Sequence, residues 1–325
     1  MAAGLVVAAA AGAAVAENKT LKMAFFASPK HQVSTDLMQP MAEAITKANV
    51  GLEVKYFPGS QIGGSPPGAF KRVINGIADI EFGLQGYTST VFPRTLLLEI
   101  PVQHKTPTDA TKALWKIYDK HLKREYKGTI VLAMWFTDVP VIMTNKLVRT
   151  PDDLKGLKLR TPSRNQAEII KALGAVPVAM PMPQTYGAIE KGVVDGAIVG
   201  VSVAGSFKLA EVVKNYIVDL PFGYSPQMIV MSARTYNSLT PAQKKVIDDN
   251  HGLKWSLRGA KSYEEERENS IKLIRERKDT QVVKLTDAER AAWTAKLKTL
   301  HDDWIKRFSK QNPAYKTILA DYLSE

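Results

Sequence analysis

Apolar residues recur at two different spacings along this chain, and the spacings predict strands that alternate with helices. Residues 21–27 are mostly apolar and residues 52–57 alternate, both typical of strands, whereas residues 33–48 between them have helical spacing. The same succession returns with a buried strand at 157–160 and a helix that ends near residue 173. Strands and helices in this order favour a parallel sheet packed against helices, so the pattern predicts an α/β protein.

A short unit occurs twice in the chain. V-I-N-G-I-A-D-I-E-F-G contains Gly76 and Asp79, and I-E-K-G-V-V-D-G-A-I-V-G contains Gly192 and Asp195 at the same relative positions. Each copy reads as the end of an apolar helix, a glycine, two small or apolar residues, an aspartate and a buried strand. Two related α/β lobes would contain such a repeat. Two lobes joined by crossing strands imply a cleft, which is a favoured place for a ligand.

The candidate chemistry lies in residues 150–200. The buried strand at 157–160 ends at Arg160, and Ser163 is suited to cap the helix that follows. Arg160 is therefore expected where a strand ends and a helix begins, the edge at which open α/β sheets bind ligands. A guanidinium fork beside helix N–H groups suits a carboxylate. The structural alternative is an ion pair with Asp152 or Asp153.

Other candidate ligand-binding residues lie at or near the ends of predicted strands. Gln85 and Tyr87 stand near the tip of a predicted strand. Residues 129–143 form a β-rich run long enough to cross between lobes. Trp135 and Phe136 are adjacent in it and face opposite sides, so one is expected to pack inward and the other to line the cleft.

The C-terminal third is predicted to be helical. We expect residues 17–137 mainly in a first lobe, 138–230 mainly in a second, and 231–325 as C-terminal helices that pack on both lobes. Thr286 and Glu289 form a capping-box pattern at the start of one helix. That helix carries an apolar stripe, interpreted as packing rather than as a cofactor site. The stripe consists of Trp293, Leu297, Leu300 and Trp304.

Composition narrows the classes of function. The 325 residues include no cysteine, which excludes a disulfide framework, a thiolate metal site and a cysteine nucleophile. The five histidines lack metal-ligand spacing, so neither a metal nor a cofactor is expected. The net charge is +12, but the basic residues are interleaved with acids along predicted helices. This pattern is typical of solvated helix faces, not of nucleic-acid binding, and its positive field would help to recruit a small anion.

The N-terminus predicts export. Residues 5–15 are apolar and alanine-rich, and Ala14-Val15-Ala16 has the A-x-A form of a cleavage site. We interpret residues 1–16 as a signal peptide, with a truncated start because a basic n-region is missing. The apolar run is too short to favour a transmembrane span. The mature protein is expected in the periplasm.

One enzymatic alternative comes from Ser202. It stands in G-V-S-V-A after a predicted strand, similar to the G-x-S-x-G nucleophile elbow of hydrolases with the last glycine replaced. His251 and His301 lie downstream as candidate partners. The alternative is a serine esterase-like enzyme.

The order of the motifs resembles one family. The chain carries G-x-Q-I-G-G, G-I-A-D-I, P-D-D-L-K-G-L-K-L-R and P-M-P-Q-T-Y-x-x-I-E-K-G-V-V-D-G over nearly the whole mature length. They resemble the solute-binding receptors of tripartite ATP-independent periplasmic (TRAP) transporters. The resemblance implies a two-lobed periplasmic-binding-protein-like receptor, not an enzyme, that closes on an organic acid and delivers it to the membrane permease subunits. It also implies that Arg160 binds the ligand carboxylate. A ligand-sensing receptor of the same fold is a further alternative.

Two departures from the family pattern bear on the ligand. Sialic-acid-type members have a second ligand arginine where this chain has Pro140, and an asparagine where it has Val199. Fewer polar ligands favour a monocarboxylate with an apolar or aromatic body over a sugar acid or a dicarboxylate. Five residues lie on segments that face the cleft in this family, although each is equally compatible with a core position. They are Phe26, Trp135, Met182, Phe207 and Phe222.

Overall fold

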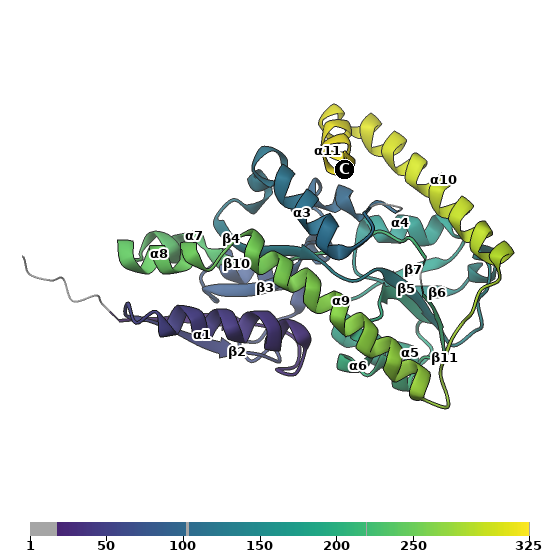
Figure 1. Cartoon of the computed structure of the whole chain (residues 1–325), viewed down its shortest axis with the longest axis horizontal. Coiled ribbons are helices and arrows are strands. Elements are labelled where there is room, and N and C mark those ends of the chain that lie inside the picture. The colour runs from purple at the N-terminus through teal and green to yellow at the C-terminus, as the bar shows by residue number, and fades with distance from the viewer. Residues whose placement is uncertain (1–17, 102–103, 219, 325) are drawn as a thin grey trace, which may run out of the picture.

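Two β-sheets, each covered by helices, organise the chain (Figure 1). The computed structural model describes residues 18–101, 104–218 and 220–324, so the predicted signal peptide lies outside the described residues. The strands of the first sheet are, in spatial order, β2 (Leu52–Phe57), β1 (Lys19–Ala24), β3 (Ile80–Leu84), β10 (Pro226–Ser232) and β4 (Thr129–Phe136). Those of the second sheet are β11 (Gln281–Val282), β9 (Asn215–Ile217), β5 (Pro140–Thr144), β8 (Gly196–Gly200), β6 (Lys158–Thr161) and β7 (Val176–Ala179). The predicted two-lobed α/β fold is confirmed.

The repeated sequence unit builds the same local structure in both sheets. β1 lies between parallel β2 and β3, and β6 lies between parallel β7 and β8. In the first unit the Asp79 carboxylate accepts a hydrogen bond from the Lys22 N–H at 2.8 Å; in the second, the Asp195 carboxylate accepts from the Lys158 N–H at 2.7 Å. Each aspartate N–H also donates to the carbonyl of the same lysine. The glycine three residues earlier has a φ of +74° in one unit and +68° in the other, a conformation that favours glycine.

The chain crosses between the sheets three times: after β4, before β10, and between β10 and β11. The first two crossings are hydrogen-bonded to each other, because the Thr137 N–H donates to the Ser225 carbonyl at 3.0 Å and the Ser225 N–H donates to Thr137 Oγ1 at 3.3 Å. The β-rich run 129–143 is therefore two strands in different sheets. β10, which falls mostly in the range expected in the second lobe, returns to the first sheet.

Helices cover both sheets. The first lobe carries α1 (Gln39–Lys47), α2 (Ala69–Ile74), α3 (Pro107–Ile117), α7 (Ala233–Asn237) and α8 (Pro241–Asp249). The second lobe carries α4 (Arg164–Ala172), α5 (Thr185–Glu190) and α6 (Val203–Ser206). In Figure 1 the long helix α9 (Leu253–Glu276) runs diagonally across the molecule and contacts β4 of one sheet and β11 of the other.

The C-terminal helices tie the lobes together from the other side. In α10 (Asp287–Gln311), Trp293 Nε1 donates to the Arg149 carbonyl at 2.8 Å and Trp304 Nε1 donates to the Leu97 carbonyl at 3.0 Å. Leu97 precedes the first crossing and Arg149 follows it, so α10 spans both lobes. α11 (Pro313–Leu323) packs on α3. The predicted stripe of α10 is buried packing, and no helix of the described residues is long and apolar enough to cross a membrane.

The prediction that one of Trp135 and Phe136 packs inward while the other lines the cleft is wrong. Both side chains are fully buried. The Trp135 ring packs against Gly259 of α9, and the Phe136 ring contacts Tyr224 and Tyr322 on the other face of β4. Because both faces of this strand are covered, neither residue reaches the cleft.

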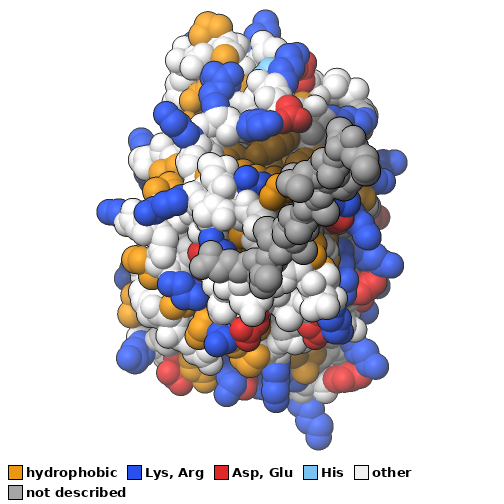
Figure 2. All heavy atoms as spheres, turned by 90° about the vertical axis from the view of Figure 1, so that its left-hand side faces the viewer, with side chains coloured by type: hydrophobic (Ala, Val, Ile, Leu, Met, Phe, Trp, Pro, Cys, Tyr) orange, Lys and Arg blue, Asp and Glu red, His pale blue; other side chains and the backbone are white. Residues whose placement is uncertain are grey.

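The positive charge is dispersed. Figure 2 shows Lys and Arg side chains scattered among neutral and acidic ones over the described part of one face. This distribution agrees with the interpretation of the basic residues as solvated surface positions.

Candidate functional site

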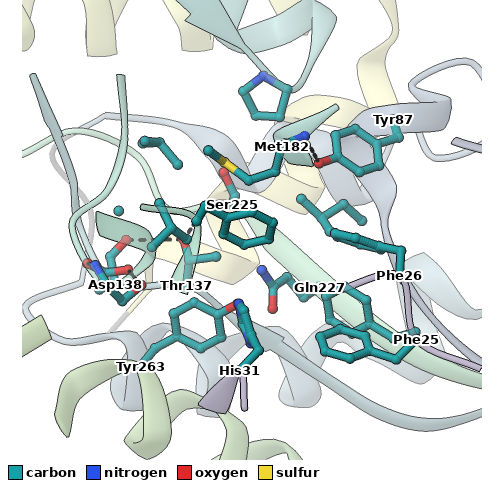
Figure 3. A pocket seen from close by; sticks show the side chains of 18 of the residues that line it. Phe25, Phe26, His31, Tyr87, Thr137, Asp138, Met182, Ser225, Gln227 and Tyr263 are labelled. Atoms are coloured by element: carbon teal, nitrogen blue, oxygen red, sulfur yellow. Dashed lines mark hydrogen bonds between the residues drawn. The ribbon is translucent and has the colours of Figure 1, made fainter. Parts of the chain in front are cut away.

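A cavity lies between the two lobes (Figure 3). It is reached by the carboxyl ends of the parallel strands β3, β6 and β8 and by the loop after β1. Such strand ends are where α/β sheets bind ligands. The apolar lining consists of Phe25, Phe26, Phe82, Leu84, Tyr87, Pro162, Met182, Val199, Val203 and Phe207. The polar lining consists of His31, Thr137, Asp138, Arg160, Ser202, Ser225, Gln227 and Tyr263, with Gly200 completing the wall.

Arg160 is a buried cation that lines the cavity. Its side chain is 1% exposed on β6. Nε donates to the Met180 carbonyl at 3.0 Å, and Nη2 donates to Tyr87 Oη at 3.4 Å. No Asp or Glu of the described residues forms a salt bridge with it, and burial lowers its pKa. The ion-pair alternative is therefore wrong for both Asp152 and Asp153, and the Asp153 carboxylate instead accepts hydrogen bonds at the start of the turn before β6.

Tyr87 links the two lobes at this point. It follows β3 in the first lobe, and its Oη accepts a hydrogen bond from the Met182 N–H of the second lobe at 2.9 Å. The same oxygen accepts from Arg160. Figure 3 shows the Tyr87 ring reaching toward Met182 at one side of the cavity. The hydroxyl thus positions the guanidinium and joins the lobes.

Aromatic rings make the body of the cavity apolar. Phe26 packs against Phe82 with ring centroids 5.6 Å apart and against Tyr87 at 6.3 Å. Phe207 of the second lobe meets His31 of the first edge-on at 5.6 Å. Such a wall suits a flat apolar or aromatic body, because ring pairs favour offset or edge-on contacts.

Asp138 and Ser202 form a buried polar pair on the second lobe's side. Asp138 Oδ1 accepts a hydrogen bond from Ser202 Oγ at 2.6 Å, and Oδ2 accepts from the Ser202 N–H at 3.1 Å. Burial raises the pKa of the Asp138 carboxyl to about 6. The two partners considered for a Ser202 nucleophile lie elsewhere: His251 Nδ1 is 2.6 Å from the Asp248 carbonyl, and His301 Nδ1 is 2.6 Å from that of Pro101.

The structure brings together five of the eight expected site residues. Phe26, Tyr87, Arg160, Met182 and Phe207 all line the cavity. It also places Val199 in the wall.

The other three lie outside the lining. Gln85, the residue after β3, is buried away from the cavity lining, and its Nε2 donates to Tyr126 Oη at 3.0 Å. Trp135 is held in the core under α9. Phe222 packs against Trp293 of α10 and borders a smaller cavity beside Pro140.

Sequence reasoning missed most of the polar lining. Gln227 carried a signal, as the one amide in the apolar run P-Q-M-I-V-M of a buried strand. Tyr263 carried none, because it lies in a helix whose sequence reads as solvent-exposed and only packing turns this residue inward. Among the described residues, no group of three or more His, Cys, Asp or Glu side chains could hold a metal ion.

The chain is similar to known solute-binding proteins over most of its length. The sequence model of the bacterial extracellular solute-binding protein family 7 matches residues 23–307. A C4-dicarboxylate-binding periplasmic protein of Rhodobacter capsulatus is 31% identical over 198 residues. That match covers 59% of this chain and 57% of the relative, so it spans less than two thirds of it.

Solved structures share the fold over nearly the whole chain. A TRAP solute-binding protein from a marine metagenome, specific for aromatic acid ligands and in complex with 3-hydroxybenzoate, is 28% identical with a TM-score of 0.87. The similarity covers 95% of this chain and 98% of that one. A TRAP solute-binding protein from Rhodoferax ferrireducens with copurified benzoate is 26% identical with a TM-score of 0.88, covering 94% and 97%.

These similarities confirm the resemblance drawn from the motifs, and with it the expected location in the periplasm. The chain therefore belongs to the bacterial extracellular solute-binding protein family 7, the solute-binding receptors of TRAP transporters.

Proposed function

We propose that this receptor captures a monocarboxylate with an apolar or aromatic body, holds the carboxylate on Arg160 and delivers the acid to its membrane permease. The observation that most directly supports this proposal is the buried Arg160 guanidinium, which has no salt-bridge partner among the described residues. A buried charge is costly unless an opposite charge pairs with it. An incoming carboxylate supplies that charge and can accept two parallel hydrogen bonds from a guanidinium.

The wall of the cavity supports an apolar body. Phe26, Phe82, Met182 and Phe207 line the same cavity as Arg160. Val199 also lines it, at the position where the family resemblance places an asparagine in sialic-acid-type members. The two solved relatives with benzoate and 3-hydroxybenzoate support an aromatic acid as the first class to test. In this proposal the contacts come from Phe26, Tyr87, Arg160, Met182 and Phe207.

We infer further that the protein is a receptor and not an enzyme. The Ser202 hydroxyl donates to Asp138, whereas a hydrolase would need it beside a histidine base. His31 lines the same cavity, but its Nδ1 accepts from the Val33 N–H at 3.1 Å and burial lowers its pKa to about 3. A ring held neutral in this way is a poor proton acceptor for a serine.

A ligand screen tests the proposal. Thermal shift and calorimetry would compare benzoate and phenylacetate with succinate, glucuronate and the neutral benzamide. A bound ligand raises the melting temperature by mass action, so the aromatic monocarboxylates should raise it and benzamide should not. Stabilisation by succinate or glucuronate alone would contradict the proposed ligand class. Hydrolysis of a nitrophenyl ester that disappears in Ser202→Ala would contradict the receptor assignment.

A further inference from the structure

The cavity has a second polar end that the carboxylate anchor does not use. In Figure 3, Tyr87 and Met182 lie on one side of the cavity, and His31, Gln227 and Tyr263 lie on the opposite side. These last three residues come from the first lobe and from α9. A ligand anchored at Arg160 and extending across the cavity therefore meets them with its far end.

Gln227 is an unusual residue for its position. It is 4% exposed in the interior strand β10, which lies between β3 and β4 and in which every residue is buried. It lines the cavity, and its Oε1 atom makes no hydrogen bond with the described residues. Nearly all buried polar atoms in proteins are hydrogen-bonded, so an acceptor left open toward a ligand cavity points to a partner on the ligand.

The two neighbours add donors to this acceptor. Because His31 Nδ1 accepts from the Val33 N–H, the proton of the neutral ring resides on Nε2, which makes that nitrogen a donor. Burial keeps the ring neutral by lowering its pKa. Tyr263, from α9, brings a phenol hydroxyl next to Gln227, and burial raises its pKa so that the proton stays on the oxygen.

We propose that Gln227, His31 and Tyr263 form a subsite for a hydroxyl group, so that the receptor selects hydroxylated monocarboxylates over their unsubstituted counterparts. A hydroxyl both donates and accepts, and so satisfies the Gln227 acceptor and a neighbouring donor at once. The inference rests on the proposed function, because it assumes a carboxylate on Arg160.

A second carboxylate does not fit this end. The neutral His31 and the amide provide no cation, and the Asp138 carboxyl lines the same cavity. A buried carboxylate without a positive partner is strongly unfavourable. The subsite should therefore bind a hydroxy acid more tightly than a dicarboxylate, because it offers no cation for a second carboxylate. It should also bind a hydroxy acid more tightly than an unsubstituted aromatic acid, which lacks the group that hydrogen-bonds there. Sites that hydrogen-bond a substrate hydroxyl reject the analogue without it, because their own polar groups are then left unpaired.

Calorimetry with matched acids tests the subsite. The ligands are benzoate, 3- and 4-hydroxybenzoate and 3- and 4-methoxybenzoate, with phenylacetate and its 3- and 4-hydroxy forms as a longer series. In at least one series a hydroxy acid should bind the wild type about tenfold or more tightly than the unsubstituted acid. A hydrogen-bonded group of this kind is worth about one factor of ten. The methoxy group accepts but cannot donate, so it should lose this advantage.

Two glutamine variants make the test specific. Gln227→Met keeps the length of the side chain and removes the acceptor, so the hydroxy and plain acids should bind within about threefold of each other. Gln85 also has a buried Oε1 without a partner but lies outside the cavity, so Gln85→Met should keep the wild-type preference. Tyr263→Phe provides a second subsite variant if Gln227→Met does not fold, and it should reduce the preference.

The possible outcomes distinguish failure of the hydroxyl subsite from failure of the proposed function on which it rests. Equal binding of hydroxy and plain acids by the wild type would overturn the subsite while the proposed function stands. A preference that persists in folded Gln227→Met, or in folded Tyr263→Phe where that variant replaces it, would also overturn it. Failure of every aromatic acid to bind the folded wild type would overturn both.

Discussion

Arg160 and Tyr87 come from different lobes and meet inside the cavity, where the guanidinium Nη2 donates to the phenol oxygen over 3.4 Å. The phenol oxygen also accepts from the Met182 N–H. The contact shows that the Arg160 side chain of the second lobe is positioned by a residue of the first. Under the proposed function, ligand binding at Arg160 is therefore coupled to the relative position of the lobes.

Arg160→Ala should abolish tight binding without unfolding the protein. Removing one partner of a buried ion pair costs about 3–5 kcal/mol, which weakens binding by about two to more than three orders of magnitude. In the ligand-free protein the same change removes a buried unpaired cation, so the melting temperature should not fall. Arg160→Lys keeps the charge but loses the fork and should bind at intermediate strength.

Arg164→Ala is the matched control for this prediction. Arg164 is exposed at the start of α4 and does not line the cavity. Calorimetry should therefore give near-normal affinity. Binding by a folded Arg160→Ala protein within a few-fold of wild type would show that another cation is the anchor.

Tyr87→Phe should weaken binding and loosen the lobes together. The change leaves the Met182 N–H without its side-chain acceptor and the guanidinium without one of its partners. Each lost hydrogen bond is worth about 0.5–1.5 kcal/mol, so we expect a loss of roughly tenfold in affinity. Small-angle scattering of the ligand-free variant should show a larger radius of gyration, because a contact across the lobes is gone. An unchanged radius with reduced affinity would limit Tyr87 to positioning the guanidinium.

Glu99 should make stability fall as the pH rises. Its carboxyl accepts hydrogen bonds from Ser163 Oγ at 2.7 Å and from Gln166 Nε2 at 3.1 Å, both of the second lobe. Burial raises the pKa of this carboxyl from 4.5 to about 8. A raised folded-state pKa contributes stability that is fully present below pH 4.5 and is lost as the pH rises through about 8.

Glu99→Gln isolates this contribution, because glutamine resembles the neutral acid and does not titrate. Urea unfolding at pH 5, 6.5 and 8 should show that the free energy of unfolding of the variant rises relative to that of the wild type, by up to about 1.4 kcal/mol per pH unit. Parallel curves for the two proteins across this range would mean that the carboxyl is already ionised in the folded state.

Gly200→Ala should disrupt the polar wall of the cavity. An added Cβ would lie 1.9 Å from Asp138 Oδ1, the oxygen that accepts from Ser202. Overpacking of this kind costs about 1–3 kcal/mol and should displace the carboxyl from Ser202. Gly187→Ala in α5 is the control, since its added Cβ has open space and alanine favours helices. Thermal unfolding should show a loss for the first variant and no loss for the second; equal stability of both would contradict this packing.

The sequence determined the elements and their local ends by itself. Strand and helix spacing comes from the alternation of apolar residues, and a capping box needs only residues three apart, as at Thr286 and Glu289, where both reciprocal hydrogen bonds are present. The repeated Gly–Asp unit could likewise be recognised in the sequence, although its hydrogen bonds, from Lys22 to Asp79 and from Lys158 to Asp195, join strands that are distant in the sequence. Arg160 could be placed at a strand end from the spacing of apolar residues.

Only the tertiary structure decided which faces are open. Trp135 and Phe136 were predicted to face opposite sides, but the sequence does not reveal that α9 covers one side of β4 and a cluster of tyrosines the other. Tyr263 and Gln227 are far apart in sequence and in different elements, and they meet because α9 crosses both lobes. Periodicity specifies which residues share a face, whereas the elements that cover that face are brought there by contacts between distant parts of the chain.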